Sequence, residues 1–267
     1  MEGRFEDAMS EEAKVVTKQR VAGRPKLLIR QTAGFVYCPG CHQPLAARAI
    51  AEVLEELGMG DRAIGVFDIG CNSFLLGLLD IDAVLTPHGR PPDMATAIKR
   101  TYPDNIVFTV QGDGGLLSIG ADPLLGALTR AEKITIIMLN NAVYGTTGGQ
   151  MAPTTLLGQV TTTTPRGRDM TRTGFPAHAA EMIATFRGVA YSARGAFDTP
   201  KNYMRTRKYI RSAFQKQMDK VGLSFVEILC ACPANWRMSP IDSLKWMEEK
   251  MLPEFPLGEF KNVDKTE

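Results

Sequence analysis

Between residues 60 and 140 the chain alternates short apolar runs with helical patterns, and this alternation limits the possible folds more than any other feature. Residues 62–70, 105–111 and 133–140 read as buried strands, RAIGVFDIG, NIVFTVQ and KITIIMLN. Helical patterns lie between them, RPPDMATAIKR at 90–100 and IGADPLLGALTRA at 119–131. Strands that alternate with helices at this spacing form βαβ units, and the resulting parallel sheets carry helices on both faces. The sequence therefore predicts an α/β fold with a mostly parallel sheet.

The same pattern continues on both sides of this region. Upstream, PLAARAIAEVLEELGMG at 44–60 places its apolar residues on one helical face. Downstream, residues 202–220 read as a helix and 222–230 as a strand. In between, residues 145–174 show no periodicity. A segment of that length inside a compact domain usually serves function or contacts a partner.

Length and composition suit one large α/β domain or two small ones, since the chain has 267 residues of which 44% are hydrophobic. We predict a polar N-terminal extension over 1–34, a ligand-binding domain over 35–232 and a C-terminal tail over 233–267. Apolar anchors such as Trp246 and Phe255 lie in the tail. They predict that the tail packs on the domain or on another subunit.

Charge and hydropathy exclude several classes of function. The formal net charge is +2, and 22% of the residues are charged, which favours neither nucleic acid nor a membrane surface as a partner. No apolar stretch approaches the roughly 20 residues that span a bilayer. The first 20 residues are polar and acidic rather than typical of a signal peptide. We therefore expect a cytoplasmic protein.

The polar residues of greatest interest follow directly after predicted strands. Gly70 and Cys71 come after the first strand, Asp113 after the second, and Asn140 and Asn141 end the third. Parallel sheets bind ligands beyond the carboxyl ends of their strands. We expect these residues to gather at one edge of the sheet.

Asp113 stands between Gly112 and Gly114 at a predicted strand-to-helix turn. Glycines allow close approach of the backbone, and the amides of a helix N-terminus favour an anion such as a diphosphate. A diphosphate beside a carboxylate needs a cation, and Mg²⁺ takes carboxylate and phosphate oxygens in octahedral geometry. A bare GDG is more often a simple tight turn, but the asparagine pair after the next strand favours the metal site. The chain contains no G-x-G-x-x-G or Walker motif that would predict another nucleotide site.

Five cysteines stand at positions 38, 41, 71, 230 and 232. Disulfides are uncommon in cytosolic proteins, so the expected roles are buried thiols, metal ligands or redox groups. A single CxxC pair, Cys38 and Cys41, leaves zinc, an iron–sulfur cluster and no metal all open.

Several short sequence motifs together resemble those of the β subunit of the 2-oxoacid:ferredoxin oxidoreductases. They are YCPGC, DIGC, TPHGR, GDGG, NNAVYGTTGGQMAPTT and CPANWRMSP, spread over residues 35 to 260. The resemblance implies a thiamine-diphosphate-binding fold of the pyrophosphate type and the coenzyme-A-dependent oxidative decarboxylation of a 2-oxoacid. TGGQMAPTT and NWRMSP look most like the 2-oxoisovalerate members, with 2-oxoglutarate or pyruvate as alternatives. A non-redox thiamine-dependent decarboxylase or synthase half is a second alternative.

The resemblance also implies roles for individual residues. Asp113, Asn141 and the carbonyl of Val143 would bind Mg²⁺. The residues surrounding thiamine diphosphate would be Ile69, Gly70, Cys71, Asn72, Gly112, Asp113, Gly114, Gly115, Asn141, Val143, Gly145 and Thr146. His88 and Arg90 are weaker candidates, His88 for the substrate or a phosphate and Arg90 for a distal carboxylate or the cofactor.

By the same resemblance Cys38, Cys41, Cys71 and Cys232 would ligate a [4Fe–4S] cluster, which takes four thiolates. Zinc uses the same ligand type, so the ligands alone do not discriminate between the two. Cys230 would be the spare thiol. The implied partners are an α subunit that supplies the glutamate facing the pyrimidine ring, γ and ferredoxin-like δ subunits, ferredoxin, coenzyme A and the 2-oxoacid.

Overall fold

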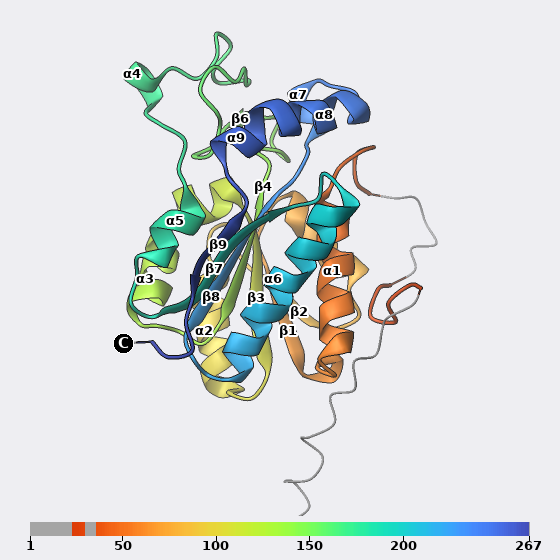
Figure 1. Cartoon of the computed structure of the whole chain (residues 1–267), viewed down its shortest axis with the longest axis vertical. Coiled ribbons are helices and arrows are strands. Elements are labelled where there is room, and N and C mark those ends of the chain that lie inside the picture. Colours follow the sequence, from red (N-terminus) through yellow and green to blue (C-terminus); the bar gives the residue numbers. More distant parts are fainter. Residues whose placement is uncertain (1–22, 30–35, 267) are drawn as a thin grey trace, which may run out of the picture.

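A seven-stranded sheet runs through the centre of the computed structural model, which describes residues 23–29 and 36–266 (Figure 1). Every pairing is parallel except that between the last two strands of the order, so the predicted mostly parallel sheet is confirmed. The strand order is β2 (Asp82–Leu85), β1 (Ala63–Phe67), β3 (Ile106–Gly112), β4 (Thr135–Asn140), β8 (Leu223–Leu229), β7 (Val189–Ala196) and β9 (Gly258–Asn262).

Helices cover both faces of this sheet, as predicted for parallel strands. On one face lie α1 (Gln43–Glu56) and α6 (Pro200–Met218); on the other lie α2 (Pro91–Thr101), α3 (Ala121–Thr129) and α5 (Ala179–Ala184) (Figure 1). Successive strand residues point to opposite faces, so each face has its own apolar core. This is why β3 and β4 are buried along almost their whole length and read as continuous apolar runs.

Short elements close the end of the sheet where the parallel strands terminate. They include three α-helices, α7 (Pro233–Trp236), α8 (Pro240–Trp246) and α9 (Leu252–Glu254), the 3-10 helix η3 (Cys71–Leu78) and the π-helices η4 (Gly115–Ile119) and η5 (Met247–Met251). Trp236, Met251 and Phe255 form a third apolar core there with residues that follow β4 and β8. The tail thus packs on the domain, and its last strand, β9, pairs with β7.

The segment without periodicity has structure of its own. It contains the hairpin of β5 (Val143–Tyr144) and β6 (Gln150–Met151), and later the short helix α4 (Met170–Thr173). The guanidinium of Arg168 ties the loop together by donating hydrogen bonds to backbone carbonyls. Because polar contacts hold this segment, its sequence shows no apolar periodicity.

Strand β7 was not predicted, because its sequence VAYSARGA carries a charge in the middle. Arg194 is completely buried and pairs with Glu227 on the adjacent strand at 2.8 Å and with Glu181 of α5. A buried charge needs such partners, and only the folded sheet supplies them. The exposed edge strand β2 and the 3-10 turn η2 (Gly60–Arg62) were likewise not predicted.

Most of the predicted extension over 1–34 lies outside the described residues, which leave out 1–22 and 30–35. Residues 23–29 pack on the domain: the amide of Leu27 donates to Glu55 at 2.8 Å, and the amide of Ile29 donates to the carbonyl of Leu78 at 2.9 Å. Among the helices of the described ranges, none combines the length and the apolar run required to cross a bilayer.

Candidate functional site

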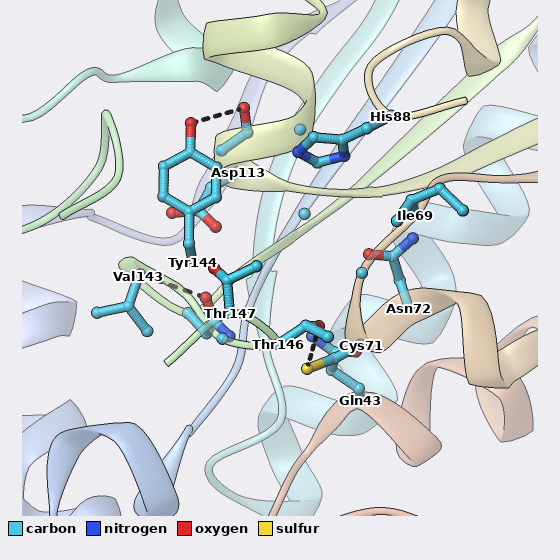
Figure 2. A pocket seen from close by; sticks show the side chains of 16 residues that line it. Gln43, Ile69, Cys71, Asn72, His88, Asp113, Val143, Tyr144, Thr146 and Thr147 are labelled. Atoms are coloured by element: carbon cyan, nitrogen blue, oxygen red, sulfur yellow. Dashed lines mark hydrogen bonds between the residues drawn. The ribbon is translucent and has the colours of Figure 1, made fainter. Parts of the chain in front are cut away.

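A pocket opens at the carboxyl ends of β1, β3 and β4 (Figure 2). It contains about 630 Å³ of space outside the protein atoms, part of it open to solvent. Its walls contain all twelve residues predicted to surround the cofactor, together with His88. The lining residues that were not predicted are Gln43, Tyr144 and Thr147.

Asp113 lies in the pocket wall directly after β3. Asp113 is only 1% exposed, and its carboxylate is hydrogen-bonded to the hydroxyl of Thr154. Burial raises the pKa of Asp113 to about 7, although the hydroxyl and nearby backbone amides oppose the rise. A buried carboxylate with this raised pKa is a candidate cation ligand, because a bound metal would offset the cost of burying its charge.

The turn after β4 presents Asn141 and Val143 to the same pocket. Ala142, between them, adopts the left-handed conformation with φ of 57°, which is costly for a residue with a Cβ. Its amide donates to the side-chain oxygen of Asn140 at 3.0 Å, and its carbonyl accepts from Thr155 at 2.6 Å. The indole of Trp236 donates to the carbonyl of Asn141 at 3.0 Å. Surrounding contacts therefore hold a strained turn in place, as is frequent at binding sites.

Close contacts leave no room for a side chain at two positions of the GDGG motif. A Cβ on Gly114 would lie 2.2 Å from the ring of Tyr144, and one on Gly115 would lie 2.0 Å from the carboxylate of Asp68. The hydroxyl of Tyr144 also donates to the carbonyl of Gly114 at 3.3 Å. Tyr144 and Asp68 thus occupy the space that side chains at these positions would need.

Replacing Gly114 with alanine is expected to weaken binding of thiamine diphosphate about tenfold, because the new methyl group must displace the Tyr144 ring that lines the pocket. Isothermal titration of the protein with thiamine diphosphate in excess Mg²⁺ measures the affinity. The double variant Gly114→Ala/Tyr144→Ala should bind thiamine diphosphate no more weakly than the single variant Tyr144→Ala, because the ring that the new methyl group would meet is absent. Additive losses would show that the ring is not the cause.

His88 reaches the pocket with a buried partner behind it. Its Nδ1 lies 3.1 and 3.2 Å from the two oxygens of Asp68, a fully buried carboxylate that also accepts the amide of Gly89 at 2.7 Å. Burial raises the pKa of Asp68, while His88 and the amide of Gly89 lower it. Asp68 was read from the sequence only as the end of a strand. An acidic residue directly after a buried strand was the available signal.

Arg90 does not line the pocket, so the structure does not support the expectation that it meets a substrate or cofactor there. Its guanidinium binds Asp122 at 2.9 Å and lies 3.9 Å from Asp93. Arg90 immediately precedes α2, and its side chain is 43% exposed. The ion pair links α2 to the start of α3 instead.

Four cysteines lie in one neighbourhood beside the pocket. Burial raises the pKa of the Cys41 thiol to about 12, and the neighbouring thiols Cys232, Cys71 and Cys38 add to the rise. Burial also raises the pKa of Cys232, with further contributions from Cys71 and Cys38. Cys71 itself lines the pocket, where its sulfur lies 3.0 Å from the hydroxyl of Thr146. Figure 2 shows Cys71 and His88 toward opposite ends of the pocket.

No group of three or more histidine, cysteine, aspartate or glutamate side chains within residues 23–29 and 36–266 is arranged to hold a single metal ion. One ion needs all its ligands around one atom, whereas each thiolate of a [4Fe–4S] cluster binds a different iron.

Comparison with known proteins agrees with this site. Residues 68–228, more than half of the chain, match the family model described as "Thiamine pyrophosphate enzyme, C-terminal TPP binding domain". The matched region begins at Asp68 and includes the GDGG and NN motifs.

The curated relatives include proteins of archaea. The chain is 39% identical to ketoisovalerate oxidoreductase subunit VorA of Methanothermobacter thermautotrophicus over 85% of this chain and 47% of that protein. It is 31% identical to 2-oxoglutarate synthase subunit KorB of Methanocaldococcus jannaschii over 87% of this chain and 89% of that protein. The chain thus spans about half the length of the ketoisovalerate relatives and most of the 2-oxoglutarate relative.

The fold also resembles a solved structure, the 2-oxoglutarate:ferredoxin oxidoreductase from Magnetococcus marinus with 2-oxoglutarate, coenzyme A and succinyl-CoA bound. The TM-score is 0.73 at 22% identity, covering 92% of this chain and 87% of that one. At that identity the likeness establishes the fold.

Proposed function

Because this chain belongs to the thiamine-diphosphate-binding subunits of the 2-oxoacid:ferredoxin oxidoreductases, we propose that it takes part in the oxidative decarboxylation of a 2-oxoacid. The net reaction converts a 2-oxoacid, coenzyme A and two oxidised ferredoxins into an acyl-coenzyme A, CO₂, a proton and two reduced ferredoxins. The observation that carries this proposal is the pocket at the carboxyl ends of β1, β3 and β4, with Cys71 in its wall.

Asp113, Asn141 and the carbonyl of Val143 would hold Mg²⁺, and the glycines beside Asp113 would admit the diphosphate. All three lie in one pocket wall, at two adjacent strand ends. When bound, thiamine diphosphate supplies an electron sink that lets the 2-oxoacid lose CO₂. The protein binds and orients it, and the surrounding apolar core keeps water from the deep side of the site.

Cys38, Cys41, Cys71 and Cys232 would hold a [4Fe–4S] cluster. The electrostatic influence of these four thiols on one another, and the position of Cys71 in the pocket wall, support this ligand set. Such a cluster would supply a one-electron acceptor. Asn235 donates to the sulfur of Cys232 at 3.3 Å and would fix its orientation.

We propose 2-oxoisovalerate as the substrate, with 2-oxoglutarate or pyruvate as the alternatives. Identity is higher to the ketoisovalerate relative than to the 2-oxoglutarate relatives. Neither lysine nor arginine occurs among the described residues that line the pocket. A second substrate carboxylate would therefore find no cationic partner in this part of the chain.

The proposed partners are an α subunit that supplies the glutamate facing the pyrimidine ring, γ and ferredoxin-like δ subunits, and ferredoxin as the acceptor. The exposed apolar side chains of Val160 and Phe175, in the segment between β6 and α5, support a protein contact there.

The test is to purify the chain anaerobically with its partner subunits and to measure iron, acid-labile sulfide, zinc and thiamine diphosphate. We expect about four irons and four sulfides per chain, stoichiometric thiamine diphosphate, and ferredoxin reduction that depends on both 2-oxoacid and coenzyme A. Faster turnover of 2-oxoglutarate or pyruvate than of 2-oxoisovalerate would correct the substrate. Zinc without iron or thiamine diphosphate would contradict the whole proposal.

A non-redox thiamine-dependent decarboxylase or synthase half is the second candidate. The family model that matches residues 68–228 describes thiamine pyrophosphate enzymes in general, which is consistent with this function. Thiamine diphosphate bound without iron, with CO₂ released but ferredoxin not reduced, would establish this function instead.

A further inference from the structure

The carboxylate of Asp113 has a side-chain partner that comes from outside the strands forming the pocket. Its Oδ2 is hydrogen-bonded to the hydroxyl of Thr154, which lies in the loop beyond the β5–β6 hairpin. Thr154 is completely buried and does not line the pocket. Its hydroxyl therefore faces the carboxylate from the protein side.

A second buried oxygen lies beside this hydroxyl, whose single proton goes to the carboxylate of Asp113 when that group is charged. Thr154 Oγ1 lies 2.9 Å from the side-chain oxygen of Asn140. The amide nitrogen of Asn140 donates to Glu227 at 2.7 Å, which settles which end of the amide faces Thr154. Glu227 is in turn held by Arg194 at 2.8 Å. The contacts thus run from the sheet interior to Asp113 through Thr154.

The backbone on both sides of Thr154 is clamped as well. Arg168 is only 6% exposed, and its guanidinium donates to the carbonyls of Pro153 at 2.9 Å and Thr155 at 2.5 Å. The same side chain also donates to the carbonyls of Thr173, Gly174 and Phe175. The hydroxyl of Thr155 donates to the carbonyl of Ala142 in the turn beside Asn141. These contacts attach the loop to the turn that carries the other proposed metal ligands.

We propose that Thr154 is a positioning residue for Asp113, and that the loop over 152–175, held by Arg168, sets the geometry of the magnesium site. The inference rests on the proposed function. Mg²⁺ demands near-ideal octahedral geometry, so the orientation of a ligating carboxylate matters. Removing a hydrogen-bond partner of a metal ligand typically costs 10- to 100-fold in metal affinity. The loop without periodicity is then part of the cofactor site.

The test compares Thr154→Val, Thr154→Ala and Thr154→Ser in the assembled complex. Titration of Mg²⁺ into complex saturated with thiamine diphosphate gives the affinity, and the electron paramagnetic resonance spectrum of bound Mn²⁺ reports the ligand geometry. We expect the valine and alanine variants to bind Mg²⁺ about 10- to 100-fold more weakly and to show an altered Mn²⁺ spectrum. Serine keeps the hydroxyl and should stay within about threefold of the wild type.

Thr96→Val is the matched control, because that buried hydroxyl donates to the carbonyl of Pro92 within α2 and lies outside the pocket wall. It should change Mg²⁺ affinity less than Thr154→Val. Arg168→Met should weaken Mg²⁺ binding while every threonine is retained, and it tests the loop if Thr154→Val does not assemble. Wild-type affinity in Thr154→Val and Thr154→Ala, or equal losses in Thr154→Ser, would overturn the inference. A wild-type complex that binds no thiamine diphosphate would overturn the proposed function instead.

Discussion

Replacing Asp113 with asparagine should weaken binding of thiamine diphosphate in the presence of Mg²⁺ by more than about 100-fold, equivalent to about 3 kcal/mol. The substitution keeps the size of the side chain but removes the charge that would face the metal. The folded, cofactor-free protein should lose no stability. Burial raises the pKa of Asp113 to about 7, above its unfolded value, so above that pH the ionised carboxylate disfavours the folded state. Isothermal titration and thermal unfolding at pH 8 measure the two effects.

Asp122→Asn is the matched control for this prediction. Asp122 is an exposed carboxylate that pairs with Arg90 outside the pocket. Its replacement should leave cofactor affinity within about twofold, because exposed ion pairs contribute only about 0–1 kcal/mol to stability and this one does not line the site. Unchanged affinity in Asp113→Asn would exclude Asp113 as a metal ligand. An equal loss in Asp122→Asn would point to Arg90 as part of the site.

Replacing Cys232 with alanine should abolish the cluster and reduce ferredoxin reduction by more than about 100-fold, because a [4Fe–4S] cluster requires four thiolates. Binding of thiamine diphosphate should persist, since Cys232 does not line the pocket. Iron and sulfide content, the electron paramagnetic resonance spectrum of the reduced complex and 2-oxoacid-dependent ferredoxin reduction are the measurements.

Cys230→Ala serves as the matched variant, two residues away at the end of β8. Cys230 is fully buried, and its thiol lies 3.4 Å from the carbonyl of Ile228. Burial raises the pKa of Cys230 well above its ordinary value. This variant should keep its iron and its electron transfer. The reverse pattern would make Cys230 the ligand, and full iron content in both variants would exclude both residues.

The sequence by itself determined the sheet and the identity of most pocket residues. Buried parallel strands read as continuous apolar runs, and the helices between them have a different period, so β1, β3, β4 and β8 were visible locally. Residues directly after such strands meet at one edge by topology alone. For that reason Asp113 and Asn141 could be placed together without coordinates. The short sequence motifs around them were specific enough to indicate the family.

Only the tertiary structure decided which polar groups pair with one another. Arg194 interrupts the apolar pattern of β7, and its buried charge is compensated by the ion pair with Glu227. Arg90 forms an ion pair with Asp122 and does not line the pocket. Asp68 behind His88 and Thr154 behind Asp113 are likewise contacts between segments far apart in the chain. A hydrogen bond between distant residues leaves no period or local spacing in the sequence. The pairings that orient the site therefore emerge only when the sheet brings its strand ends together.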